Sequence, residues 1–144
     1  MIKAEELVSD RTVLVIEDDD DCRDLLGEYI TSKFHCSSLT APGIIEAASL
    51  LRTKKFSLIV SEHEFFDPAI TGDDLIRELQ DTAESTPVIF YTKSEQVSET
   101  QLKRFHHPCS VVQKPWLGSL EKEISEFLHL PRPPRSEPFL EKHF

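Results

Sequence analysis

A short apolar run, Phe56–Val60, constrains the fold of this chain most, because it ends abruptly in the polar stretch Ser61–Glu64. A run of this length fits either a strand buried on both faces or part of a buried helix. The β-branched residues Ile59 and Val60 favour the strand. We therefore expect a central strand that leaves the core with a carboxylate, Glu62, at its carboxyl end.

Four further strands are predicted, and amphipathic segments separate them. The predicted strands are Thr12–Ile16, His35–Thr40, Val88–Tyr91 and Ser110–Val112. Apolar residues at helical spacing predict helices that begin after Asp20 or Asp21 (which could cap the first one), near Pro42, at Gly72, near Ser98 and at Leu117. Alternating strands and helices imply a parallel sheet covered on both faces. The expected fold is α/β, doubly wound and flavodoxin-like, with five parallel strands in the order 2-1-3-4-5 and five helices.

Composition and charge narrow the class of protein. The 144 residues are 39% hydrophobic and 29% charged, which fits one soluble domain, and the net charge of −10 argues against nucleic-acid binding. No stretch approaches the ~20 apolar residues that cross a bilayer, and residues 1–10 form a leader without a secretory signal. Three cysteines without metal-type spacing indicate free, buried thiols in a reducing cytoplasm. We expect a cytoplasmic domain at 11–130 and a flexible, proline-rich tail at 131–144 that is dispensable for folding.

Polar side chains follow several predicted strands, and the carboxyl ends of parallel strands share one edge of the sheet. The acidic run Glu17–Asp21 follows the first strand, Glu62 the third, Thr92 the fourth and Lys114 the fifth. Clustered carboxylates repel unless a cation neutralises them or one takes up a proton. Oxygen ligands suit Mg²⁺, whereas a lysine and a hydroxyl suit a phosphoryl group. The pattern predicts a metal-assisted phosphoryl site, although each residue could also be an ordinary capping or surface group.

Three motifs, VLVIEDD, PVIFYT and VVQKPW, make residues 11–130 resemble the receiver domain of two-component response regulators. The single-domain chemotaxis (CheY-like) type is closest in size. The resemblance implies that Glu17 and Asp18 replace the family's metal-binding acidic pair. Glu62 and the backbone carbonyl of Glu64 would complete the ligands of a weak Mg²⁺ site.

The same resemblance assigns roles at the fourth and fifth strand ends. It implies that Thr92 and Lys114 contact a phosphoryl group and that the Lys114-Pro115 bond is cis. The residue after Thr92 is usually small in the family, but here it is Lys93. One hypothesis is that the Lys93 ammonium reaches Glu62 as an internal cation, and the alternative is that Lys93 is a solvated surface lysine.

Other departures concern the phosphoacceptor. The family has an aspartate where this chain has Glu62, whose carboxyl lies about 1.5 Å further out. A misplacement near 1 Å can cost about 100-fold in phosphoryl transfer. The loop that ends at Gly72 is longer than usual, and Val111 replaces an aromatic switch residue. The resemblance therefore favours a pseudo-receiver, with Asp67 as a less favoured substitute acceptor.

The expected function is that of a single-domain receiver in a phosphorelay, acting by protein–protein contact and not as an enzyme. Its partner would be a sensor histidine kinase or a downstream effector, with no nucleic acid or membrane, and it would be a monomer or weak homodimer. One alternative is a conventional receiver phosphorylated by a histidine kinase. Less favoured are a Mg²⁺-dependent phosphatase-like enzyme, which needs an aspartate nucleophile, and a flavodoxin-like binder of small molecules. His63, His106 and His107 are expected to be ordinary surface residues.

Overall fold

The computed structural model describes residues 11–82, 84–131 and 138–144. Its centre is a parallel sheet in the order β2-β1-β3-β4-β5, which confirms the predicted topology. The strands are β1 (Thr12–Ile16), β2 (Ser37–Ala41), β3 (Leu58–Ser61), β4 (Val88–Thr92) and β5 (Cys109–Gln113). Their bounds differ from the predicted ones by up to two residues, since strand ends follow hydrogen bonding and not apolarity alone.

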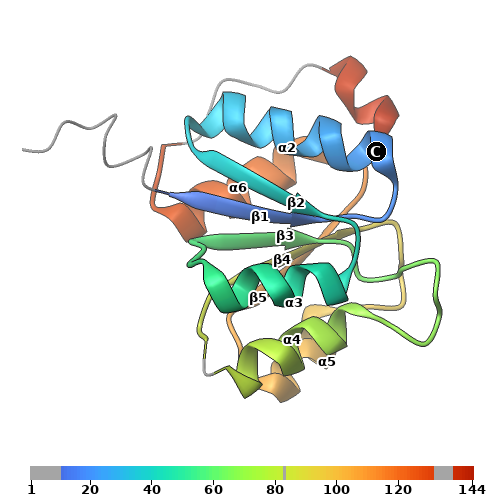
Figure 1. The fold of residues 1–144 in the computed structure, drawn as a ribbon. Coiled ribbons are helices and arrows are strands. Elements are labelled where there is room, and N and C mark those ends of the chain that lie inside the picture. Colours follow the sequence, from blue (N-terminus) through green and yellow to red (C-terminus); the bar gives the residue numbers. More distant parts are fainter. Residues whose placement is uncertain (1–10, 83, 132–137) are drawn as a thin grey trace, which may run out of the picture.

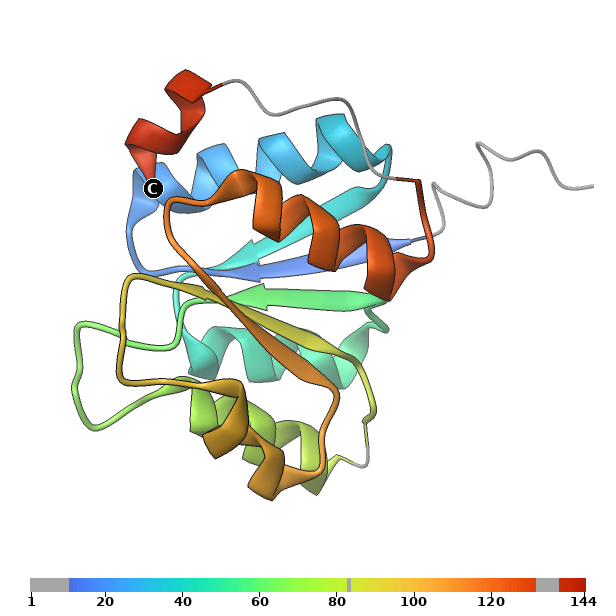
Figure 2. The same cartoon turned by 180° about the vertical axis from the view of Figure 1, so that it is seen from behind.

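Helices cover both faces of the sheet. They are α2 (Asp20–Phe34), α3 (Ile44–Thr53), α4 (Gly72–Asp81), α5 (Glu99–Leu102), which runs on into the 3₁₀ turn η1 (Lys103–Phe105), and α6 (Leu117–Leu128). Figures 1 and 2 show α2 and α6 on one face, with α3, α4 and α5 on the other. The expected doubly wound α/β fold is thereby confirmed. None of the helices in the described part of the chain is long and apolar enough to span a membrane.

The central strands are buried on both sides, as the apolar runs predicted. In β1, Val13 and Val15 belong to the core beneath α2 and α6, whereas Leu14 and Ile16 belong to the core on the opposite face. Successive strand residues point to opposite faces, so a continuous apolar run serves two cores at once. This packing fixes where each strand ends and therefore where the polar residues after it emerge.

The first helix begins one or two residues earlier than predicted, at Asp20. Its N-cap is Asp19, whose Oδ1 accepts a hydrogen bond from the backbone N–H of Cys22 at 2.9 Å. This bond lowers the pKa of Asp19. Asp20 and Asp21 were predicted as caps but lie in the first helical turn, where acids still interact favourably with the helix dipole. Much of the acidic run thus has a structural role.

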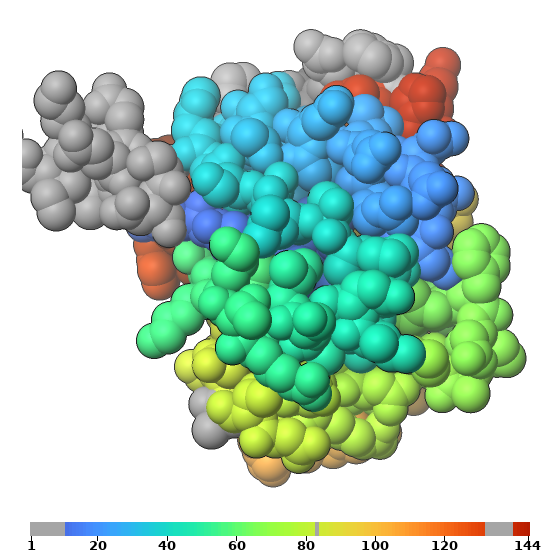
Figure 3. Space-filling view, in the orientation of Figure 1, coloured from blue at the N-terminus to red at the C-terminus, as the bar shows by residue number. Residues whose placement is uncertain are grey.

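The loop between β3 and α4 is closed at its neck. Glu64 and Thr71 form an isolated antiparallel bridge, and Gly72 N donates to His63 O at 2.8 Å. A Cβ on Gly72 would lie 2.3 Å from Cε1 of Phe90, so only glycine fits there. The loop beyond the neck (light green at the right of Figure 3) protrudes from the body of the domain.

The C-terminal segment differs from the prediction. A 3₁₀ helix, η2 (Pro138–His143), leads to Phe144, which is 6% exposed and belongs to the core beneath α2 and α6. The Phe144 ring meets the Tyr91 ring edge-on, with centroids 5.8 Å apart. The Cys22 thiol donates to His143 O at 3.1 Å, and Figure 1 shows the segment beside the start of α2. The prediction of a flexible tail is therefore wrong for 138–144.

Parts of the predicted termini lie outside the described residues, namely the leader at 1–10 and the middle of the tail at 132–137. The three cysteines are free, as expected. Cys36 is buried as predicted, but the prediction of buried thiols is wrong for Cys22 and Cys109, which are partly exposed.

Candidate functional site

At the carboxyl edge of the sheet, the ammonium of Lys114 lies between two glutamates. Lys114 Nζ donates to Glu17 Oε1 at 2.7 Å and to Glu62 Oε2 at 3.0 Å. All three side chains are at most 10% exposed. Each residue is the first after its strand (β5, β1 and β3), so the sheet itself brings them together. We call these three residues the Glu–Lys–Glu cluster.

Burial sets the protonation of this cluster. Burial disfavours the charged form and raises the pKa of Glu17, and the bond from Lys114 offsets this only in part. Burial also acts to lower the pKa of Lys114, but the carboxylates of Glu62 and Glu17 outweigh it, and that pKa is raised. Glu17 Oε2 is buried and has no hydrogen-bond partner among the described residues. The lysine therefore stays charged, and Glu17 is disposed to take up a proton on acidification.

Glu62 is held by the start of its own loop. Its Oε1 accepts backbone N–H bonds from His63 at 2.9 Å and Glu64 at 3.2 Å, while its Oε2 accepts from Lys114. The additional methylene of glutamate, compared with aspartate, lets the carboxyl fold back over these amides. The acceptor position is thus a buried carboxylate with both oxygens engaged.

The expected Mg²⁺ ligands do not form a cation site in this arrangement. Asp18 Oδ2 accepts from the backbone N–H of Phe66 at 2.8 Å, and the Lys114 ammonium binds Glu17 and Glu62. No group of three histidine, cysteine or acidic side chains suited to a metal occurs in the described ranges. The Lys114 ammonium therefore places a positive charge between these two carboxyl groups.

Lys93, which follows β4, and Asp67, in the loop after β3, both lie on the surface. Lys93 is exposed and forms no ion pair with any residue that the structure describes, so the cation at Glu62 is Lys114 and not Lys93. The reason is that the Thr92 side chain is buried at the strand end, whereas the next residue faces solvent. Asp67 is also exposed, and its Oδ1 accepts from Ala69 N at 3.0 Å as a turn residue.

The Thr92 hydroxyl is engaged within its own turn. Its Oγ1 accepts from the backbone N–H of Ser94 at 3.1 Å. Ser94 in turn donates through its hydroxyl to Glu64 Oε1 at 2.8 Å, and its carbonyl accepts from Gln113 at 2.9 Å. The peptide bond between Lys114 and Pro115 is cis, as the resemblance implied.

Comparison with known proteins identifies the family. The model of the response regulator receiver domain matches residues 13–118, a span that contains the whole Glu–Lys–Glu cluster and Thr92. The chain belongs to this family. Receiver domains are signalling modules of two-component systems and interact with histidine kinases and effectors. No match was found among curated proteins.

Solved receiver structures share the fold. The response regulator TrrA from Thermotoga maritima, in complex with Mg²⁺-BeF, is 20% identical, with a TM-score of 0.69 over 81% of this chain and 98% of that one. The non-phosphorylated HemR receiver domain from Leptospira biflexa is 23% identical, with a TM-score of 0.69 over 87% and 99%. The chemotaxis protein CheY4 from Vibrio cholerae is 19% identical, with a TM-score of 0.68 over 81% and 98%.

This receiver contains an aromatic contact that the sequence did not indicate. Lys114 Nζ lies 5.9 Å from the centroid of the Tyr91 ring, whose edge also meets Phe144. Burial raises the pKa of Tyr91, and its hydroxyl has no hydrogen-bond partner within the described ranges. The C-terminal segment therefore contacts the residue that packs beside the Glu–Lys–Glu cluster.

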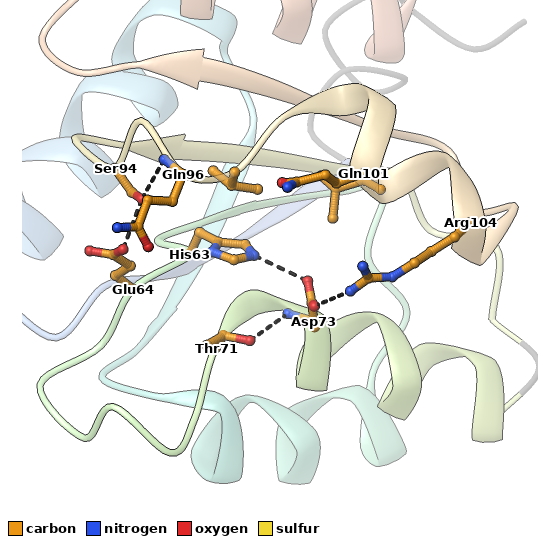
Figure 4. Close-up of a pocket in the computed structure, with 10 residues that line it drawn as sticks. His63, Glu64, Thr71, Asp73, Ser94, Gln96, Gln101 and Arg104 are labelled. Atoms are coloured by element: carbon orange, nitrogen blue, oxygen red, sulfur yellow. Dashed lines mark hydrogen bonds and ion pairs between the residues drawn. The ribbon is translucent and has the colours of Figure 1, made fainter.

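A polar pocket of the receiver lies between the loops after β3 and β4 (Figure 4). His63 Nε2 lies 3.1 Å from Asp73 Oδ1, and Arg104 bonds the other oxygen of Asp73 at 2.5 Å. The ring of His63 also packs edge-on against Phe90, with centroids 5.1 Å apart. His63 is thus a half-buried structural residue and not an ordinary surface one. These residues come from different elements that only the fold brings together, so no sequence motif indicates them.

Proposed function

We propose that this receiver conveys a two-component signal by contact with a partner protein and that its phosphoacceptor position is degenerate. Glu62 supplies a permanent charge in place of one that phosphorylation would add. The observation that carries this proposal is the Glu–Lys–Glu cluster, in which Lys114 binds Glu17 at 2.7 Å and Glu62 at 3.0 Å. The conventional phosphoacceptor is the alternative against which it is tested.

The burial and hydrogen bonds of the Glu62 carboxylate make it a poor nucleophile. In-line phosphoryl transfer depends on a positioned oxygen with open access to the phosphorus. Glu62 is 8% exposed, and each of its oxygens already accepts at least one hydrogen bond. Transfer would therefore require those bonds to break and the carboxylate to leave its amides.

The single charge of Glu62 favours a receiver whose conformational equilibrium is shifted slightly and permanently over one that phosphorylation switches. A glutamate carries one negative charge, against about 1.5–2 for a phosphoryl group. A ligand shifts a two-state equilibrium only by its differential affinity for the two states. The Lys114 ammonium already binds Glu62, and the Thr92 side chain accepts from Ser94 within its own turn. We infer that the conformation seen here is the one presented to the partner.

The remaining features of the proposal follow from the same site. Mg²⁺ would bind weakly, because it would have to displace the Lys114 ammonium. The partner would be a sensor histidine kinase or a downstream effector in the cytoplasm, and the receiver would act as a monomer or weak homodimer without enzymatic activity.

Intact-mass spectrometry after incubation with acetyl phosphate and Mg²⁺ tests the proposal. We expect no gain of about 80 Da, the mass of a phosphoryl group, on the wild-type chain. A Glu62→Asp variant is the matched control, because it shortens the acceptor and leaves Lys114 in place. A hydroxylamine-labile adduct on wild-type Glu62 or Asp67 would overturn the proposal and establish the conventional receiver.

A further inference from the structure

A groove lies between the start of α3 and the loop that follows β3. Its volume is about 240 Å³, and its apolar wall includes Pro42, Ile45, Phe65, Phe66 and Ile70. In Figure 3 the protruding loop (light green) stands beside α3 (blue-green). We call this feature the Ile45–Phe66 groove.

The groove exposes apolar surface that folding leaves uncovered. Phe66 is 85% exposed and Ile45 is 73% exposed. Among the described residues the third large hydrophobic side chain of this kind, Trp116, lies outside the groove. Single exposed apolar residues are common, but two beside one concave surface indicate an interaction site.

The charge around the groove is of one sign. Asp18, Glu46 and Asp67 line it, and no lysine, arginine or histidine of the described ranges does so. The exposed Asp20 and Asp21 follow Asp18 along the chain and extend the acidic surface. Complementary charge steers association and rejects like-charged partners. An occupant of this groove should therefore be basic as well as apolar.

We propose that the Ile45–Phe66 groove docks a protein segment that inserts an apolar side chain and carries lysine or arginine beside it. This inference rests on the proposed function, action by protein contact, and specifies the chemistry of the partner. A nucleic acid does not fit, because the acids that attract a basic peptide repel phosphates.

The groove is linked to the Glu–Lys–Glu cluster through one hydrogen bond. Phe66 N donates to Asp18 Oδ2 at 2.8 Å, and Asp18 directly follows Glu17. The position of the Phe66 wall therefore depends on the residue adjoining the buried cluster. A segment docked against Phe66 acts on Asp18 through this bond, which provides a route between partner binding and the site.

The test selects peptides from a random display library on the full-length chain and measures their affinity by fluorescence anisotropy. Each selected peptide is then measured against Phe66→Ser, with Trp116→Ser as the matched control for an exposed hydrophobic residue outside the groove. We expect Phe66→Ser to weaken binding about 10-fold or more, the value of burying one large apolar side chain, and Trp116→Ser to have little effect. The selected peptides should be rich in lysine or arginine, and binding should weaken with added salt.

Several outcomes would overturn the proposal. The first is that no selected peptide loses affinity for Phe66→Ser. The second is that the selected peptides are acidic. The third is that Phe66→Ser and Trp116→Ser weaken binding equally. Sedimentation equilibrium adds an independent arm, since self-association abolished by Phe66→Ser would assign the groove to a second copy of the chain. Unfolding of both variants should match that of the wild type. A phosphoryl adduct on Glu62 would overturn the proposed function, whereas the peptide affinities are measured on the unmodified chain, so the two failures are distinguishable.

Discussion

Replacing Lys114 by methionine removes the only cation of the Glu–Lys–Glu cluster and keeps a side chain of similar length. Glu17 and Glu62 would then be two buried carboxylates without a counter-charge. Breaking a buried ion pair by removing one partner typically costs about 3–5 kcal/mol, because the remaining charge is uncompensated. All three side chains are at most 10% exposed, so we expect Lys114→Met to lower the free energy of unfolding by about 3–5 kcal/mol at pH 7.

The loss should depend on pH with a definite sign. The pKa of Glu17 is already raised above its ordinary 4.5 in the folded protein, and removing Lys114 raises it further. Between the unfolded and folded values the folded state binds more protons, so stability falls as the pH rises through that window. Urea unfolding should therefore show a smaller loss at pH 5 than at pH 7.

Two variants complete the experiment. Lys93→Met removes an exposed lysine from the same edge of the sheet and should change stability by less than about 0.5 kcal/mol. Adding Glu17→Gln to Lys114→Met removes one uncompensated charge and should recover part of the loss. The reasoning fails if Lys114→Met costs less than about 1 kcal/mol, or if its cost is the same at pH 5 and pH 7.

Three further predictions concern packing and metal binding. Phe144→Ala should lower the free energy of unfolding by about 2 kcal/mol in thermal melts and expose Tyr91; an unchanged melt would mean that the C-terminal segment does not dock. Gly72→Ala should cost about 3 kcal/mol in urea unfolding, because its Cβ would lie 2.3 Å from the Phe90 ring, and wild-type stability would contradict the close packing. Calorimetric titration should give a Mg²⁺ dissociation constant in the millimolar range or weaker for the wild type and tighter binding for Lys114→Met. Low-micromolar affinity of the wild type would refute the hypothesis that the Lys114 ammonium competes with Mg²⁺ for the two glutamates.

Local sequence patterns were sufficient to predict the sheet and much of the site. Buried parallel strands require continuous apolar runs, and each run ends where polar residues begin. The strand order then places the first residue after each strand at one edge. Glu17, Glu62 and Lys114 were predicted to meet for this reason, and the structure brings them into direct contact.

The remaining features depend on side-chain direction and on contacts between distant segments. Lys93 and Lys114 both follow strands, and sequence alone does not tell which ammonium turns inward. The contact between Tyr91 and Phe144 joins residues far apart in the chain, and isolated apolar residues after a proline-rich stretch gave no periodic signal for it. His63 and Asp73 likewise meet only because the loop closes at its neck.

The closed neck of the β3–α4 loop separates loop residues that can be replaced from the fixed structure beneath them. Backbone bonds join the two sides of the neck, and Gly72 seats against Phe90 without room for a side chain. Phe65 and Ile70 still pack against the core, whereas the exposed residues 66–69 lie beyond the neck, so their length and sequence can change without shifting Glu62 or α4. The loop is therefore a natural place for an insertion or a grafted recognition sequence, and partner choice can evolve there while the domain beneath it stays the same.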